Sequence, residues 1–211
     1  MYTPTFKNPV VIVADGSFPH HAEPLKELRE AGTVICCDGA VHRVVKRGFE
    51  PHFIVGDMDS IAPDHAAAFA DRLYRSDDQE SNDLTKAVNF CLQHGADEAT
   101  IIGATGKRDD HSLGNISLLA AYAEKLRRVE MLTDYGRFTP LLSSATLKSY
   151  AGQQVSIFCL TTGTRIVSEG LKYPLQGVVF DSWWKGTLNQ ASGDTFSLLF
   201  DKGKVILFRQ Y

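Results

Sequence analysis

Short runs of consecutive apolar residues recur along the first two thirds of the chain, with helical patterns between them. The runs cover residues 9–15, 33–38, 53–57, 99–104 and 129–134. Uninterrupted apolar runs of this length are typical of strands buried on both faces, as in a parallel sheet. Strands that alternate with helices form right-handed βαβ units. We therefore expect an open, mostly parallel, Rossmann-like α/β sheet with flanking helices over residues 1–137.

The strongest helical pattern lies in residues 81–95. Its apolar residues recur at the spacing of one helix face, and they are Leu84, Ala87, Val88, Cys91 and Leu92. Ser81 or Asn82 would cap the start of this helix, and Gly95 would end it. Weaker patterns of the same kind occur over residues 41–45 and 113–123.

The helical period disappears in the last third of the chain. Short β-branched or aromatic runs follow there, at residues 153–160, 164–171, 178–183, 195–200 and 204–210. Gly-containing turns separate several of them, for example at 161–163, 191–194 and 201–204. The pattern predicts a small antiparallel β-sandwich over residues 138–211, so the fold class is α/β followed by all-β.

Composition and charge narrow the possible partners. The 211 residues are 44% hydrophobic and 22% charged, with a formal net charge of −3 and no run of Lys or Arg. A nucleic acid is therefore excluded as the main partner. No apolar stretch approaches the ~20 residues that a membrane span needs, and residues 1–9 lack the pattern of a secretory signal. We expect a cytoplasmic protein whose four cysteines are reduced core thiols.

Carboxylates follow nearly every strand-like run. They are Asp15, Asp38, Asp57 with Asp59, and Asp134, and Asp83 stands in the first turn of the strongest helix. Ligands of open α/β sheets bind beyond the carboxyl ends of the strands. A single acid there could cap a helix or face water. Several acids at one edge would repel one another unless a cation lies between them, so we predict a functional edge.

The stretch GDMDS, residues 56–60, places two of these acids directly after a buried run. If the backbone stays extended, Asp57 and Asp59 point the same way and Met58 turns toward the core. Hard oxygen ligands at this spacing suit Mg²⁺ better than zinc or copper. Mg²⁺ in such sites takes its other ligands from water and from substrate phosphates. The pair therefore predicts a magnesium site for nucleotide chemistry.

A glycine-rich loop, GATGKRDDHSLGN at residues 103–115, follows one strand-like run and opens a helix. Gly103 and Gly106 permit close backbone approach, and a helix start offers free N–H groups. Its charged residues are Lys107, Arg108, Asp110 and His111. The loop matches neither the P-loop nor the GxGxxG pattern. The charged residues together favour a phosphate-binding loop over a solvated turn.

Six motifs in order along the chain resemble those of thiamine pyrophosphokinases. They are CCDGA, GDMDS, DDQESNDLTKA, GKRDDH, EGLKYPL and GTLNQASGD, and they cover nearly the whole chain. The resemblance implies transfer of a pyrophosphoryl group from ATP to the hydroxyethyl oxygen of thiamine, which gives thiamine diphosphate and AMP with Mg²⁺ as cofactor. It also implies a homodimer whose active sites lie between the α/β domain of one subunit and the sandwich of the other.

The resemblance also implies residue roles. The metal-site acids would be Asp57, Asp59 and Asp83, and the catalytic set would add Arg108 and Asp110. The nucleotide would be bound by Asp38, Arg108, Asp110 and His111, beside Gly103, Gly106 and Lys107 of the loop. Thiamine would be bound by Gln79, Asp83, Tyr173, Thr187 and Asn189. The base that accepts the hydroxyl proton, Asp83 or another acid of the edge, stays open.

The chain departs from the family pattern at three positions. Lys107 replaces the second glycine of a usual GGR, which adds a charge that could help to hold phosphate. Asn82 replaces a Thr, a change that keeps a helix-capping residue. Leu188 replaces the Ser of a usual TSN segment, which removes one polar contact expected for thiamine.

Two other functions stay open at this point. A magnesium-dependent phosphohydrolase is suggested by DMDS and DHS, although both fit the known phosphatase patterns poorly. A non-catalytic thiamine or nucleotide sensor is suggested by Leu188. Every acid of the predicted metal site is nevertheless present, which favours catalysis.

Overall fold

The computed structural model describes residues 5–211. Residues 1–4, part of the segment in which we predict no secretory signal, lie outside the described residues. The chain divides into two compact units, one made of the residues up to Asn115 with Lys125–Asp134, the other of Ile116–Glu124 with Tyr135–Tyr211. A domain boundary between residues 137 and 138 would fall inside strand β7 (Gly136–Leu141), and that boundary stays a prediction.

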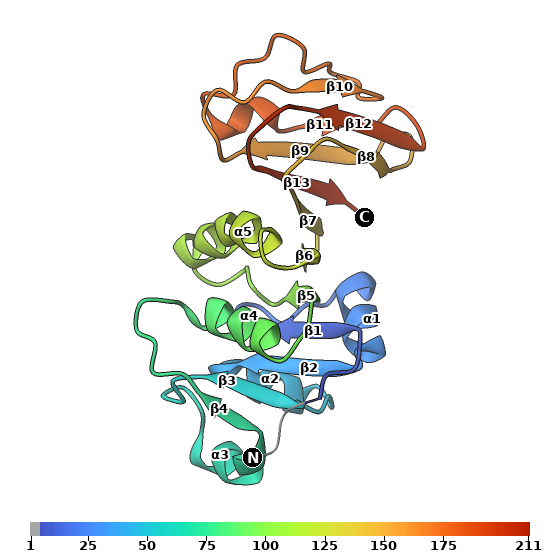
Figure 1. The fold of residues 1–211 in the computed structure, drawn as a ribbon. Helices are drawn as coiled ribbons and strands as arrows, with labels where there is room; N and C mark the ends of the chain where they lie inside the picture. Colours follow the sequence, from blue (N-terminus) through green and yellow to red (C-terminus); the bar gives the residue numbers. More distant parts are fainter. Residues whose placement is uncertain (1–4) are drawn as a thin grey trace. The chain divides into compact units, whose positions relative to one another are not determined.

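The first unit alternates strands and helices around one parallel sheet (Figure 1). Its strands are β1 (Val10–Val13), β2 (Thr33–Cys37), β3 (Phe53–Gly56), β4 (Leu73–Arg75), β5 (Glu98–Ile102) and β6 (Arg128–Leu132). Its helices are α1 (Ala22–Glu30), α2 (Val41–Lys46), α3 (Pro63–Ala68) and α4 (Asp83–Gln93), with 3-10 turns η1 (Asp38–Ala40) and η2 (Ala70–Arg72). Helix α5 (Asp109–Ala123) begins in this unit, and its residues from Ile116 onward belong to the second unit. The strand order is β6-β5-β1-β2-β3-β4, and every pairing is parallel.

Helices cover both faces of this sheet. On one face, Val11 and Val13 of β1 pack in a buried cluster with Leu28 of α1 and with Val41 and Val44 of α2. On the other face, α4 packs across β1, β2 and β3 (Figure 1). Burial on both faces explains why the strands are uninterrupted apolar runs. The predicted α/β fold of this part of the chain is confirmed.

Helix α4 forms where the apolar periodicity is strongest. Asn82 caps its start, because the Asn82 Oδ1 accepts a hydrogen bond of 2.9 Å from the Thr85 N–H. The helix ends before Gly95, which has a φ of +80°. The sequence analysis missed α1, α3 and β4. These are short elements with few or no fully buried side chains, so they leave little periodic signal.

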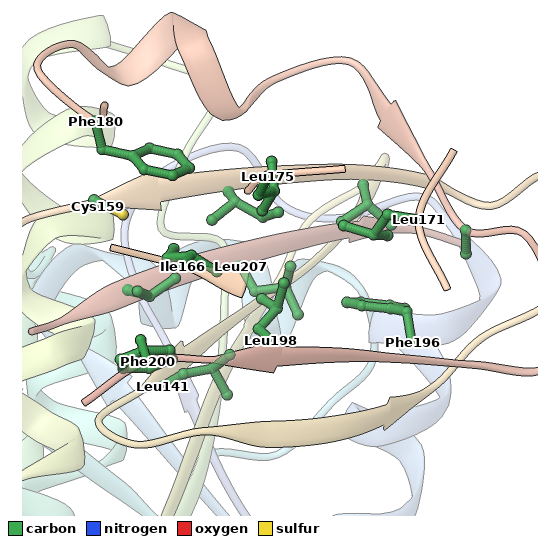
Figure 2. Close-up of a cluster of buried hydrophobic side chains, with 14 residues drawn as sticks. Leu141, Cys159, Ile166, Leu171, Leu175, Phe180, Phe196, Leu198, Phe200 and Leu207 are labelled. Carbon is green, nitrogen blue, oxygen red and sulfur yellow. The ribbon is translucent and has the colours of Figure 1, made fainter. Parts of the chain in front are cut away.

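The second unit is a sandwich of two antiparallel sheets. One sheet has the order β11 (Asn189–Gln190), β9 (Gln154–Cys159), β13 (Val205–Gln210), β7, and the other has the order β10 (Val167–Glu169), β12 (Thr195–Leu199), β8 (Ala145–Lys148). The core between the sheets contains side chains from both, such as Cys159 and Leu207 of the first and Phe196 and Leu198 of the second (Figure 2). The predicted sandwich is confirmed.

One strand prediction in this unit is wrong. Residues 178–183 form a loop that leads into the 3-10 turn η3 (Trp183–Gly186). The apolar run there has another cause, because Phe180 is buried in the sandwich core while its neighbour Val179 is exposed (Figure 2). Across residues 5–211, the structure contains no helix with the length and apolar character needed to cross a membrane.

Candidate active site

The carboxyl ends of β1 and β5 border a cavity of about 520 Å³ in the first unit. The chain runs from β1 through β2 and β3 to β4 on one side, and then returns to place β5 on the other side of β1. Such a switch point leaves a crevice outside the strand ends, and this is where ligands of open α/β sheets bind. Three segments line the cavity: residues 14–16 after β1, residues 79–86 at the start of α4, and residues 104–115 after β5.

Three carboxylates meet beside this cavity. Asp38, Asp57 and Asp59 each direct one carboxylate oxygen to a common region, where the three oxygens lie within 4.8 Å of one another. Asp57 also lines the cavity. Three acids of the edge predicted from the sequence therefore converge at this point, and Asp38 is one of them.

The backbone brings these acids together in a way that we did not predict. Strand β3 ends at Gly56, and Met58 has a φ of +72°, so the expectation of an extended backbone through Asp59 is wrong. Met58 nevertheless packs against the core, as expected. Asp38 also has a positive φ, +38°. A Cβ on Gly56 would lie 2.8 Å from the Asp38 Cβ, so a glycine is required there for Asp38 to approach.

Asp38 has the properties expected of a cation ligand. Its side chain is buried, its Oδ2 accepts a hydrogen bond of 3.3 Å from the Ser60 N–H, and its Oδ1 is buried without a hydrogen-bond partner among the described residues. Burial raises the pKa of Asp38 to about 6, and the nearby charges of Asp83 and Asp57 add to this rise. An orphaned oxygen within a carboxylate cluster fits a hard cation such as Mg²⁺.

Lys86 is a residue of this site that the sequence analysis missed. Its side chain is buried at the start of α4 and lines the cavity. The ammonium lies 3.1 Å from the Asp83 carboxylate and 3.4 Å from the Asp57 carboxylate. Burial by itself would lower the pKa of Lys86, but the hydrogen bonds and charges of Asp83 and Asp57 outweigh burial and raise it. The lysine is therefore charged at neutral pH.

Asp83 thus has a defined place in the structure. It does not belong to the group of three converging carboxylates, and Lys86 connects it to Asp57. The pKa of Asp57 is lowered, first by the hydrogen bond from the Asp59 N–H and then, against the effect of burial, by Lys86. The metal set predicted from the sequence, Asp57, Asp59 and Asp83, stays a prediction.

The glycine-rich loop after β5 packs closely against the loop after β1. Gly16 N–H and Ser17 N–H donate hydrogen bonds of 2.6 and 2.8 Å to the carbonyls of Gly103 and Thr105. Gly103 and Gly106 have φ values of +66° and +88°, and a Cβ on either would lie 2.8 Å from an atom of the first loop. The two glycines therefore allow the loops to pack together, and their approach to a phosphate stays a prediction.

The basic residues of this loop line the cavity and are paired with acids. Lys107 Nζ lies 3.2 Å from Asp15, which also binds Arg43. Arg108 Nε donates a hydrogen bond of 3.1 Å to Asp110, and this pairing lowers the pKa of Asp110 to about 2. The Lys107 and Arg108 pairs are largely exposed to solvent, so an anion can compete for them without a burial penalty.

The remaining acid of the predicted edge, Asp134, has a structural role. Its Oδ1 accepts hydrogen bonds of 2.7 and 2.9 Å from the His20 and His21 N–H groups, which fixes the entry into α1. Gln79 and His111, predicted to bind thiamine and the nucleotide, both line the cavity.

The residues of the second unit that we predict to bind thiamine differ in their exposure and in their hydrogen bonds. Asn189 is buried, and its side-chain amide exchanges hydrogen bonds of 3.2 and 2.8 Å with the backbone of Tyr173. Thr187 donates a hydrogen bond of 2.7 Å to the Trp184 carbonyl. The Tyr173 ring is exposed, and Leu188, at a φ of +59°, is 81% exposed. The Asn189 amide thus has an internal structural role.

The raised pKa of Asp38 gives a testable effect on stability. An acid that is harder to ionise in the folded state destabilises that state as pH rises from the unfolded pKa toward the folded one. In metal-free protein, Asp38→Asn should therefore increase the free energy of unfolding, by roughly 1 kcal/mol near pH 4.5 and roughly 3 kcal/mol near pH 7.5. Urea unfolding at both pH values with a chelator present measures this gain. A gain that shrinks as pH rises would contradict it.

Family models match both units of the chain. A model described as "Thiamin pyrophosphokinase, catalytic domain" matches residues 25–131, and one described as "Thiamin pyrophosphokinase, substrate-binding domain" matches residues 136–208. Among curated relatives, thiamine pyrophosphokinase 1 of Oryza sativa subsp. japonica is 30% identical over 149 residues, which cover 59% of this chain and 55% of the rice protein. The chain thus spans about half the length of the curated relatives it matches.

Solved structures share the fold over nearly the whole chain. Thiamine pyrophosphokinase from Bacillus subtilis has a TM-score of 0.79 at 22% identity, and the match covers 95% of this chain and 98% of that one. Thiamin pyrophosphokinase from Candida albicans has a TM-score of 0.80 at 16% identity, with 95% and 90% covered. At such identities the likeness shows the fold, an α/β sheet followed by an antiparallel unit.

Proposed function

Because the chain belongs to the thiamin pyrophosphokinase family, we propose that it transfers the pyrophosphoryl group of ATP to thiamine. The hydroxyethyl oxygen of thiamine attacks the β-phosphorus of ATP, and the bond from that phosphorus to the AMP oxygen breaks. The products are thiamine diphosphate and AMP, and the hydroxyl proton leaves to a base.

One observation carries this proposal beyond family membership. The cavity at the switch point is lined by Asp57 and Asp83, by the basic residues Lys86, Lys107 and Arg108, and by His111, and the carboxylate cluster lies beside it. Phosphoryl transfer needs little covalent chemistry from a protein, but it needs charge neutralised on the phosphates and the attacking oxygen held in line. A carboxylate cluster that can hold a cation, together with the basic side chains of the cavity, supports the proposal because it supplies the charge neutralisation.

A divalent metal, Mg²⁺, fits the carboxylate cluster and would be held by Asp38, Asp57 and Asp59, with Asp83 as the further acid that the family resemblance implies. When bound, Mg²⁺ neutralises charge on phosphate oxygens. Lys86 holds Asp57 and Asp83 in place beside it. Arg108 and Lys107 exchange their exposed acid partners for the triphosphate. For Arg108 the reason is that a guanidinium binds phosphate more strongly than it binds a solvated carboxylate.

Thiamine is the second substrate in this proposal, bound with help from Gln79 in the first unit and Tyr173 in the second. The exposed ring of Tyr173 can face the cationic thiazolium of thiamine. We also propose a homodimer that joins an α/β unit to the sandwich of the partner subunit. Large exposed apolar side chains along residues 173–188 support this assembly, among them Val179, Trp184 and Leu188.

We place the protein in the cytoplasm as part of this proposal. Cys36, Cys37, Cys91 and Cys159 are buried free thiols, and burial raises the pKa of each. Buried thiols of this kind suit a reducing compartment.

The proposal is tested by product analysis. Purified protein is incubated with ATP, Mg²⁺ and thiamine, and thiamine diphosphate and AMP are quantified together by chromatography. We expect both products in equal amounts and only when thiamine is present. ADP as the nucleotide product would indicate transfer of a single phosphoryl group. Free phosphate without thiamine would favour a phosphohydrolase, and thiamine binding without product would favour a sensor.

A further inference from the structure

Two histidines, neither of which was predicted to be functional, form a pair that contacts the loop after Asp59. His42 lies on α2 and His65 on α3, and their Nδ1 atoms are 2.6 Å apart. The two ring centroids are 4.7 Å apart, and the ring planes are tilted by 39° to each other. Both side chains are half-buried. At this distance one proton lies between the two Nδ1 atoms, so one ring donates and the other accepts.

The other nitrogen of His42 contacts the loop that carries the acids. His42 Nε2 is 3.0 Å from the Ser60 carbonyl oxygen and 3.3 Å from the Ala62 nitrogen. Ser60 in turn contacts two of the converging carboxylates, because its N–H donates to Asp38 Oδ2 at 3.3 Å and its hydroxyl donates to Asp59 Oδ1 at 2.9 Å. A continuous chain of hydrogen bonds therefore runs from α3 through α2 to the carboxylate cluster.

The hydrogen-bond partners assign the protons in this chain. His42 Nε2 has two partners that need opposite tautomers, because it would donate to the Ser60 carbonyl at 3.0 Å or accept from the Ala62 N–H at 3.3 Å. The shorter contact favours the tautomer in which Nε2 carries the proton and donates it to Ser60. In the neutral ring, His42 Nδ1 then has a lone pair and accepts the proton of His65 Nδ1. His65 thus fixes the ring orientation and the tautomer of His42.

We infer that His42 is a positioning residue for the metal-binding acids, acting through Ser60, with His65 holding its tautomer. The inference rests on the proposed function, since it assumes that a divalent cation binds Asp38, Asp57 and Asp59. Groups that orient metal ligands from behind commonly change metal affinity by 10- to 100-fold when they are removed. Neither Ser60 nor His42 needs to touch the substrate for this effect.

Two substitutions of His42 separate its two hydrogen bonds. In His42→Asn the amide occupies the position of Nδ1, so it keeps the contact with His65 and loses the one with Ser60. In His42→Gln the longer side chain reaches the position of Nε2 and can still donate to Ser60. Mn²⁺ is titrated into the substrate-free, metal-free proteins, and free Mn²⁺ is measured by its electron paramagnetic resonance signal. We expect His42→Asn to weaken Mn²⁺ binding about tenfold and His42→Gln to stay within about threefold of wild type.

The outcomes separate this inference from the proposed function. Wild-type Mn²⁺ affinity in His42→Asn would overturn the inference. Equal losses of Mn²⁺ affinity and of thermal stability in both variants would also overturn it, because they would show that the His42 ring only supports the fold. If His42→Asn does not fold, His65→Ala provides the test. We expect its Mn²⁺ affinity to fall about threefold, and an unchanged affinity would overturn the inference. A wild type that makes thiamine diphosphate and AMP but fails these tests would leave the proposed function intact. A wild type that binds no Mn²⁺ overturns the inference in either case.

Discussion

Asp57→Asn is expected to reduce the thiamine-dependent formation of AMP by about a thousandfold or more, while the protein still folds. Asparagine has the shape of aspartate but no charge, so the carboxylate cluster loses an anionic ligand and Lys86 loses one of its two ion-pair partners. Electrostatic stabilisation of a transferring phosphoryl group is commonly the largest catalytic effect in such sites. The Asp57 side chain is partly exposed, so the free energy of unfolding should change by no more than about 1 kcal/mol.

The matched control for this variant is Asp71→Asn. Asp71 is an exposed aspartate of the same unit, in η2 and outside the lining of the active-site cavity. Turnover of the control should equal that of the wild type. Folded Asp57→Asn protein with near wild-type turnover would rule out the metal assignment, whereas an unfolded variant would show that the acid also supports the fold.

Lys86→Met is expected to change turnover and metal affinity in opposite directions. Loss of the ammonium should lower turnover by about 100-fold or more, because Asp57 and Asp83 lose the charge that holds them beside the phosphates. The same loss removes a positive charge next to the carboxylate cluster, so the cluster should bind Mn²⁺ several-fold more tightly. Steady-state turnover at saturating Mg²⁺ and Mn²⁺ titration of the substrate-free protein measure the two effects.

Lys46→Met provides the control for this experiment, since Lys46 is an exposed lysine at the end of α2. Lys86→Arg keeps the charge in a larger side chain and should recover part of the turnover. Two results would contradict the prediction. Weaker Mn²⁺ binding in Lys86→Met would mean that positioning of Asp57 by the lysine outweighs the repulsion between its charge and the cation. Turnover within twofold of wild type would mean that the lysine serves only the fold.

The fold was predictable where burial leaves a regular pattern. Strands such as β1 and β2 are fully buried, so their sequences are continuous apolar runs, and α4 buries most of one face. Strand β4 has three residues of intermediate or high exposure, and α3 has no buried residue. Elements like these are fixed by their neighbours in the fold, so a reading of local periodicity does not find them.

The location of the site was predictable from the sequence, but the arrangement of its side chains was less so. The rule that ligands bind beyond strand ends indicated the edge that carries Asp38, Asp57 and Asp59. The positive φ of Met58 depends on packing and is not encoded in an acid-x-acid spacing. Lys86 follows Asp83 by three residues, which from sequence alone reads as an ordinary pair on a helix surface. Its proposed role depends on its burial next to Asp57, which follows the end of strand β3.

The contact between the loops after β1 and β5 limits how this cavity can be redesigned. An added methyl group on Gly16 would meet backbone atoms at 2.3 to 2.9 Å, and one on Gly103 would meet the Ala14 carbonyl oxygen at 2.8 Å. An engineer who seeks a different phosphate donor should therefore leave these glycines fixed and randomise the side chains that face the cavity, such as Gln79, Thr105 and Lys107. The backbone there acts as a constant frame, and new specificity has to come from the side chains it carries.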